Sequence, residues 1–143
     1  MADVDASRYA AVYFVGGKGA MFPYLQQDRL VRQGARYEEG PMYLDNTVVD
    51  GRLVTGQNPW STWSTAEAMV RALGHAPVAR DPTREELAVQ VLAAYHRGGV
   101  DAAREARAAR PGADKRLLLM HALVAAMQGR PADAWRLQAL ARG

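Results

Sequence analysis

The feature that most constrains this chain is a short β-hairpin signal near its middle. Asp50-Gly51 separates two β-rich segments, residues 47–49 and 52–55. Both positions of an Asp-Gly pair tolerate the positive φ that a tight two-residue turn requires. The pattern therefore predicts two antiparallel strands joined by this turn.

A helix is predicted directly after the hairpin. Asn58-Pro59 turns the chain, and Ser64 followed three residues later by Glu67 matches a capping box. Gly74 is the expected end of this helix. Four apolar residues form its expected buried stripe: Ala66, Met69, Val70 and Leu73.

The region before the hairpin predicts further α/β structure. Residues 9–15 form an apolar, β-rich run that is typical of a central parallel strand, and Gly16-Gly17 ends it. Residues 22–33 predict a helix, and residues 35–38 predict a short strand.

After Arg80 the composition changes, and the remaining sequence predicts four helices. Thr83 and Glu86 form a second capping box, and Gly98-Gly99 should end the helix that follows. Further helices are expected at 101–110, 114–128 and 132–142. The apolar faces are expected to include Leu87, Val91, Leu92 and Tyr95, then Leu117, Met120, His121, Val124 and Met127, and finally Trp135 and Leu140.

The last two predicted helices form an αα-hairpin, with Gly129 as a stop and Pro131 in the first turn of the final helix. The pattern at 122–137 resembles one tetratricopeptide-type unit. Because a stacked solenoid generally needs about three units, an appended helical cap is favoured over a peptide-binding groove.

Composition excludes several classes of site. The chain has no cysteine, so disulfides, thiolate metal sites and cysteine nucleophiles are excluded within it. The net charge of +3 comes from arginines after residue 80, but Asp101 and Glu105 interrupt Arg104, Arg107 and Arg110. A solvated helix face is favoured there, so no nucleic-acid partner is predicted.

Location and membrane association follow from the apolar runs. No stretch of about 18 apolar residues exists, and residues 1–8 lack a secretory signal pattern. We therefore expect no membrane partner and a cytoplasmic location.

Other reactive side chains form no recognisable catalytic pattern. Ser61, Thr62, Ser64 and Thr65 cluster, but their spacing suits helix capping rather than a nucleophile elbow. Histidines occur at 75, 96 and 121, and none has a histidine four residues away. The sequence therefore predicts no catalytic residue, no metal site and no cofactor, and it favours a packing role for His121.

Two blocks resemble the PfpI family of the class I glutamine amidotransferase-like superfamily. The first block is 5–21, and the second runs from Phe22 through Leu73. The second is the more specific, because the Asp-Gly turn, Thr-Gly-Gln-Asn-Pro and the helix follow in the family's order. The resemblance covers about half of the chain. It implies an α/β fold: a truncated flavodoxin-like three-layer sheet with a β-hairpin, at 1–80, followed by an all-α segment at 81–143.

The resemblance also indicates what this chain lacks. Relatives carry several dozen residues between the two blocks, including the nucleophilic cysteine, whereas here Met21 directly precedes Phe22. In relatives the Gly-Gly loop helps to form an oxyanion hole, so Gly16 and Gly17 are implied ligand-binding residues, although a plain strand-end turn is the alternative. The family's loop at Asn58 and Trp60 borders the pocket, which makes both implied ligand contacts.

These observations favour a non-catalytic PfpI-like pseudoenzyme that acts as a binding or assembly module. One alternative is a glyoxalase III-like, deglycase-like or amidotransferase-like enzyme whose site is completed by another chain or a non-cysteine nucleophile. Another is a truncated product without selected function. Because the strand at 9–15 is too apolar for an exposed edge, we expect a homo-oligomer, and the helical tail is a candidate surface for a protein partner.

Overall fold

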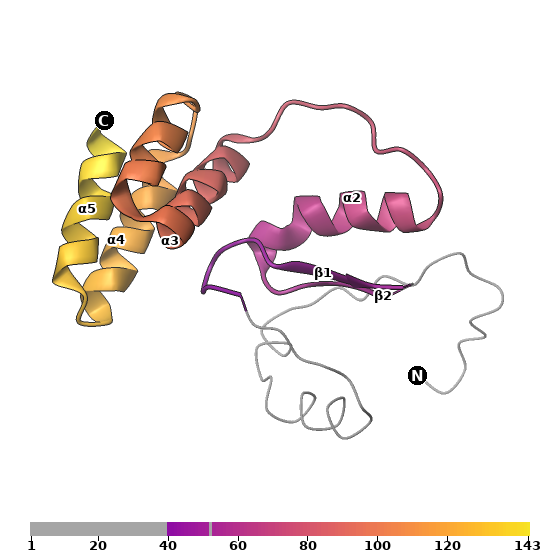
Figure 1. Cartoon of the computed structure of the whole chain (residues 1–143), viewed down its shortest axis with the longest axis horizontal. Coiled ribbons are helices and arrows are strands. Elements are labelled where there is room, and N and C mark those ends of the chain that lie inside the picture. Colours follow the sequence, from indigo (N-terminus) through magenta and orange to yellow (C-terminus); the bar gives the residue numbers. More distant parts are fainter. Residues whose placement is uncertain (1–39, 52) are drawn as a thin grey trace, which may run out of the picture.

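A computed structural model describes residues 40–51 and 53–143 of the chain. It contains a two-stranded antiparallel sheet, helix α2 against that sheet, and a C-terminal helical part made of α3, α4 and α5 (Figure 1). The elements predicted at 9–15, 22–33 and 35–38 lie outside the described residues. So do Gly16, Gly17 and the expected three-layer sheet.

The predicted hairpin is confirmed, although Asp50, which was predicted to lie in the turn, belongs to strand β1 and pairs with Leu53. Strand β1 spans Thr47–Asp50 and strand β2 spans Leu53–Gly56, with Thr47 opposite Gly56 and Asp50 opposite Leu53. Gly51 has a φ of 56°, the positive value that the turn requires.

Helix α2 is confirmed, but its predicted N-terminal cap is wrong. A 3₁₀ turn, η3 (Pro59–Ser61), leads into α2 (Thr62–Ala72). The Asn58 side chain caps this unit by accepting a hydrogen bond from the Trp60 N–H at 2.9 Å. Ser64 lies inside the helix, where its hydroxyl donates to the Ser61 carbonyl and the Asp45 carboxylate instead. The helix ends before Gly74, whose φ is 83°.

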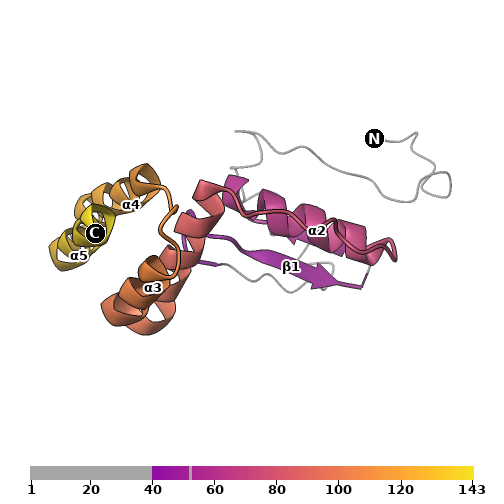
Figure 2. The same ribbon diagram turned by 90° about the horizontal axis from the view of Figure 1, so that it is seen from above.

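Helix α2 lies along the hairpin, as Figures 1 and 2 show from two directions. The approach is close at Gly56, where a Cβ would collide with the Thr65 side chain. Met69 and Val70 of the expected stripe are half-buried, whereas Ala66 is exposed and Leu73 is 43% exposed. The stripe prediction therefore holds only at its centre.

Helix α3 spans Arg84–Ala108 and begins with the predicted capping box. The Thr83 hydroxyl accepts from the Glu86 N–H at 3.2 Å, and the Glu86 carboxylate accepts from the Thr83 N–H at 2.7 Å. Gly99, with φ 73° and ψ −163°, interrupts the helix. The expected stop at this glycine and the new helix after it are confirmed.

The helical hairpin is also confirmed. Helices α4 (Lys115–Met127) and α5 (Pro131–Arg142) pack along each other and against α3. The Asp114 carboxylate caps α4 by accepting from the Arg116 N–H at 2.7 Å. Gly129 has a φ of 71° between the two helices, and Pro131 opens α5 as expected.

Most of the buried core lies among α3, α4 and α5. Val91, Leu92 and Tyr95 of α3 are buried as predicted. On α4 and α5 the prediction is partly wrong, because Met127 is 79% exposed and Trp135 is 70% exposed. Residues 117–119 are three leucines in a row, so the apolar pattern alone did not define which face of α4 would be buried. In the structure Leu117 and Leu118 are buried in the core, and the face that carries Met127 is exposed.

Candidate functional site

Two side chains of the segment 55–59 form hydrogen bonds that stabilise the local structure around the hairpin. The Gln57 amide pairs with the Gly40 backbone, accepting from its N–H at 2.8 Å and donating to its carbonyl at 3.1 Å. Its Oε1 also accepts from the Asn46 side chain at 3.0 Å. This side chain therefore fastens the segment before β1 to the end of β2.

Asn58 has a similar role. Its Nδ2 donates to the Leu44 carbonyl at 2.6 Å, while its Oδ1 accepts from the Trp60 N–H. Asn58 lines neither of the two cavities described below. Its amide positions the turn that carries Trp60.

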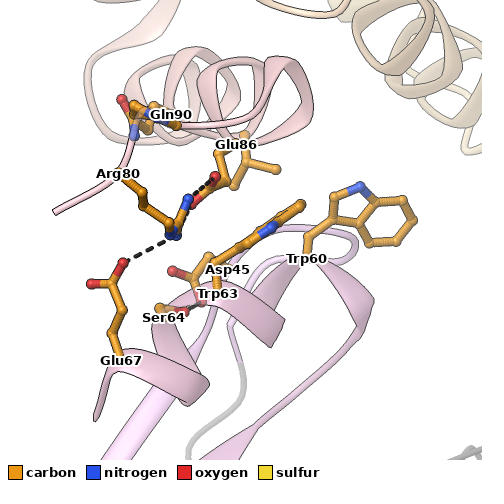
Figure 3. A pocket seen from close by; sticks show the side chains of 10 residues that line it. Asp45, Trp60, Trp63, Ser64, Glu67, Arg80, Glu86 and Gln90 are labelled. Carbon is orange, nitrogen blue, oxygen red and sulfur yellow. Dashed lines mark hydrogen bonds and ion pairs between the residues drawn. The ribbon is translucent and has the colours of Figure 1, made fainter. Parts of the chain in front are cut away.

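Trp60 lines a cavity of about 270 Å³ between η3, α2 and the first turns of α3. Its ring also contacts Tyr43 edge-on, with centroids 5.4 Å apart, and packs against the buried core. Trp63 lines the same cavity, so Trp60 and Trp63 together supply its aromatic surface (Figure 3). We call this space the tryptophan cavity.

The polar lining of the tryptophan cavity is mainly acidic. Its described lining residues include three carboxylates and a single cation: Asp45, Glu67, Glu86 and Arg80 (Figure 3). Asp45 precedes β1, Glu67 belongs to α2, Glu86 belongs to α3, and Arg80 lies in the connection between those helices. Four separate segments therefore converge here.

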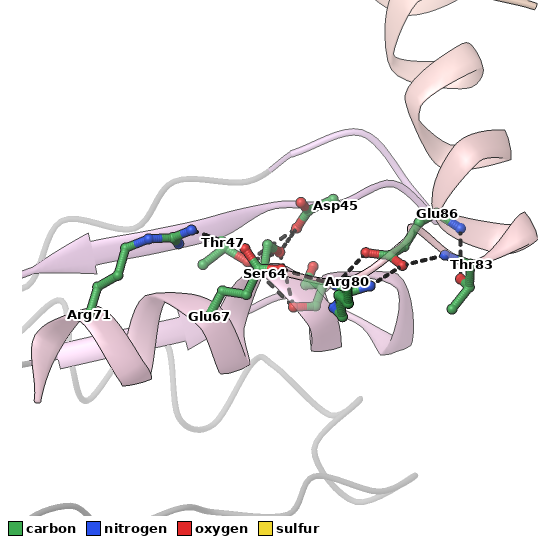
Figure 4. Close-up of polar contacts among 9 residues, drawn as sticks. Asp45, Thr47, Ser64, Glu67, Arg71, Arg80, Thr83 and Glu86 are labelled. Carbon is green, nitrogen blue, oxygen red and sulfur yellow. Dashed lines mark hydrogen bonds and ion pairs between the residues drawn. The ribbon is translucent and has the colours of Figure 1, made fainter. Parts of the chain in front are cut away.

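Arg80 links these segments. Its guanidinium donates two hydrogen bonds to the Glu86 carboxylate, both at 2.7 Å, and a third to Glu67 at 3.0 Å. Glu67 also pairs with Arg71 at 3.0 Å (Figure 4). The paired geometry with Glu86 is the strong bidentate form of an arginine–carboxylate contact.

This arrangement keeps Glu86 ionised. The hydrogen bond from Arg80 lowers the pKa of Glu86 below its ordinary value, and hydrogen bonds to Thr83 add to the effect. Contact with Glu86 likewise raises the pKa of Arg80. The described lining thus contains three carboxyl groups, of which Glu86 is held ionised by Arg80, against a single guanidinium.

A hydroxyl cluster lies beside the same cavity. The Asp45 carboxylate accepts from Ser64 at 2.6 Å and from Thr47 at 3.1 Å (Figure 4). The Thr47 hydroxyl lies 2.7 Å from that of Ser64 and 3.1 Å from that of Thr65. Within the described cluster no histidine or lysine contacts a hydroxyl, and the charged partner of the Ser64 and Thr47 hydroxyls is the Asp45 carboxylate.

The three histidines lie on different elements, although His96 and His121 line one common cavity. His75 is exposed after α2, His96 lies on α3, and His121 is buried in α4. The part of the chain that the structure describes contains no group of three His, Asp or Glu residues placed to hold a metal ion. None of its helices combines the length and apolar character needed to cross a bilayer.

Sequence reasoning identified Trp60 but missed the acidic lining. Glu67 and Glu86 were interpreted only as capping residues, and Arg80 only as a domain boundary. The signal that could have revealed the contact is weak, because Arg80 and Glu67 are thirteen positions apart and meet only after the connection folds back.

Comparison with protein-family models, curated proteins and solved structures finds no match for this chain.

Proposed function

We propose that this chain is a non-catalytic, PfpI-like binding module with a truncated flavodoxin-like domain, and that the tryptophan cavity binds a basic side chain of a protein partner. The observation that carries this proposal is the combination of Trp60 and Trp63 with three carboxylates. Indole faces attract guanidinium and ammonium groups, and the excess negative charge does so as well.

Arg80 supports the choice of ligand. A guanidinium already lies among these carboxylates and makes short hydrogen bonds to Glu86 and Glu67. The lining can therefore surround such a group, while the Asp45 carboxyl group makes no described hydrogen bond with Arg80 and bonds instead to the Ser64 hydroxyl. The non-catalytic part rests on the absence of cysteine from the 143 residues.

The binding test uses a charged ligand and its neutral counterpart. N-acetyl-arginine amide should quench or shift the tryptophan fluorescence, whereas N-acetyl-citrulline amide, similar in shape but uncharged, should bind at least about fivefold more weakly. Trp63→Ala should abolish the response. Trp135→Phe is the matched control, because Trp135 lies exposed on α5, away from the cavity residues. Equal binding of the two amides would contradict the proposal.

The catalytic alternative is tested separately. We expect the purified chain to consume methylglyoxal no faster than a buffer blank. Turnover that disappears in Ser64→Ala would replace the binding proposal with an enzyme, because among the described serine and threonine hydroxyls Ser64 has the shortest hydrogen bond to a carboxylate, 2.6 Å.

A specific observation also favours the assembly role. Leu119, Leu123 and Met127 lie one helical turn apart on α4 and are 44%, 61% and 79% exposed. In an antiparallel pair of such helices, Leu123 would meet its own copy while Leu119 met Met127, so the stripe is self-complementary. We propose that a second copy of this chain covers it.

Light scattering after size-exclusion chromatography tests this assembly. The wild type should elute as a dimer at micromolar concentration, and Leu123→Glu should convert it to a monomer with an unchanged circular dichroism spectrum. Val78→Glu is the control, since Val78 is 89% exposed but lies outside the stripe. A monomeric wild type would refute the assembly role and leave the binding proposal intact.

A further inference from the structure

A second cavity contains a buried polar atom with no partner. The cavity has a volume of about 250 Å³ and lies among α3, α4, α5 and the segment before β1. His121 lines it, is only 6% exposed, and its Nε2 has no hydrogen-bond partner among the described residues. A buried polar nitrogen left unpaired is costly, so it marks a place where a partner is missing.

The chemistry of this nitrogen is defined by the rest of the ring. Burial lowers the pKa of His121 to about 4, so the ring is neutral near pH 7. The Tyr43 backbone acts in the opposite direction. A nitrogen of a neutral imidazole either carries the proton and donates, or presents a lone pair and accepts. The missing partner of Nε2 is therefore a hydrogen-bonding group, and a hydroxyl or amine can satisfy the nitrogen in either form.

The remaining lining defines the body of the ligand. One part of the wall is apolar and includes Met42, Val124 and Leu137. The other part carries His96, Gln128 and Arg130. Arg130 is already engaged, since it pairs with Asp133 at 2.8 Å. An apolar wall with one unpartnered ring nitrogen fits a compact apolar molecule that carries a single hydroxyl or amine group.

The volume limits the size of that molecule. A dry apolar cavity of about 150 Å³ is known to hold one benzene ring. The cavity beside His121 is larger than this but smaller than the usual range for drug-sized ligands, which begins near about 300 Å³. One substituted aromatic ring is the expected size.

We propose that this cavity is a binding site for a small aromatic alcohol or amine, which forms a hydrogen bond with His121 Nε2 through its O–H or N–H group and packs its ring against Met42, Val124 and Leu137. This site is separate from the tryptophan cavity, shares no described lining residue with it, and does not depend on the function proposed there.

The test compares three probes that differ in the donor: phenol, anisole and toluene. Titration calorimetry on the wild-type chain should show phenol binding about tenfold more tightly than anisole or toluene, because only phenol carries a hydroxyl, which can satisfy the buried nitrogen in either of its neutral forms. A long-range ¹H–¹⁵N spectrum should show phenol shifting the His121 Nε2 resonance. The chain has only three histidines, which makes that resonance assignable.

Two variants complete the experiment. His121→Leu should lose the preference for phenol over anisole, whereas His75→Gln, which changes an exposed histidine outside the cavity, should keep it. If His121→Leu fails to fold, the ratio of the wild-type affinities for phenol and anisole and the shift of the Nε2 resonance still test the proposal. Equal affinities for phenol and anisole, no binding of any probe, or an unmoved Nε2 resonance would each overturn the proposal.

Discussion

Acidification should lower the free energy of unfolding of this protein, and the decrease should begin at a higher pH than the titration of carboxylates. The pKa of His121 falls from 6.5 to about 4 on folding, chiefly because burial disfavours the charged ring. The unfolded chain therefore binds more protons than the folded chain between these values. Since stability follows the difference in bound protons, the free energy of unfolding should decrease as the pH falls through this window.

The magnitude follows from the two pKa values. For a single group with these values, the loss between about pH 7 and about pH 5 is about 2 kcal/mol, and it approaches about 3 kcal/mol near pH 4. The side chain is only 6% exposed, so solvent screens little of this effect. The pKa of His96 is also lowered, again mainly by burial, which adds a contribution of the same sign.

The carboxylates act in a separate window. The pKa values of Glu86 and Asp133 are lowered from 4.5 and 3.8 by hydrogen bonds from Arg80 and from Tyr95, respectively. Their contributions are present above those ordinary values and are lost only as the pH falls through the folded values. The histidine effect is therefore measurable on its own above about pH 5.

Urea denaturation at several pH values provides the assay. The wild type should lose stability steadily from near neutral pH to about pH 5, while His121→Leu should show a much flatter dependence. His75→Gln should retain the wild-type slope. A wild-type stability that stays constant or rises over this range would refute the burial argument for His121.

Three further substitutions test the local structure by the same assay at neutral pH. Thr83→Ala removes half of the capping box of α3 and should cost about 1 kcal/mol. Gly99→Ala places a side chain at a φ of 73° and should cost about 1–2 kcal/mol, whereas Gly112→Ala, where a Cβ meets only an ordinary contact, should be nearly neutral. Tyr95→Phe removes the 2.5 Å hydrogen bond to Asp133 and should cost about 1 kcal/mol. The pKa of Tyr95 is raised, mainly by burial, so the wild type should lose stability above about pH 10. Tyr95→Phe should lose stability less steeply than the wild type in that range.

The sequence was most informative where structure depends on neighbouring residues. Asp50-Gly51, the Thr83 and Glu86 box, and the Gly129 to Pro131 connection each act within a few positions, so residue chemistry alone indicated them. The predicted cap of α2 was wrong because both Asn58 and Ser64 are residues that can cap a helix. The 3₁₀ turn η3 extends the helical segment toward the N-terminus, so the Asn58 side chain binds a free N–H group at its start, whereas Ser64 lies inside the helix.

The candidate sites were mostly beyond sequence reasoning. The contacts of Arg80 join residues thirteen and six positions away, and the cavity at His121 requires three helices and the segment at Met42 to meet. A packing role for His121 was predicted, but its unpaired nitrogen was not. Whether a buried ring finds a partner depends on tertiary packing, which no local pattern records.

Tyr43 connects the two cavities, and this connection can be tested. Its ring lies edge-on to Trp60, 5.4 Å between centroids, and edge-on to His121, 6.2 Å between centroids. Among the described residues other than glycine, it alone has a positive φ, 59°, a conformation that costs free energy unless its surroundings hold it. The ring is therefore held in place by contacts with both sides.

Removing that ring should alter both cavities at once. In Tyr43→Ala, water should reach His121, so its pKa should rise from about 4 toward the ordinary value of 6.5. Trp60 should become more exposed, and its fluorescence should shift to longer wavelength in a background that carries both Trp63→Phe and Trp135→Phe, which leaves Trp60 as the single tryptophan of the chain. Tyr43→Phe keeps the ring and should leave both signals unchanged. If the pKa of His121 and the fluorescence of Trp60 do not change together in Tyr43→Ala, the two cavities are independent and Tyr43 does not couple them.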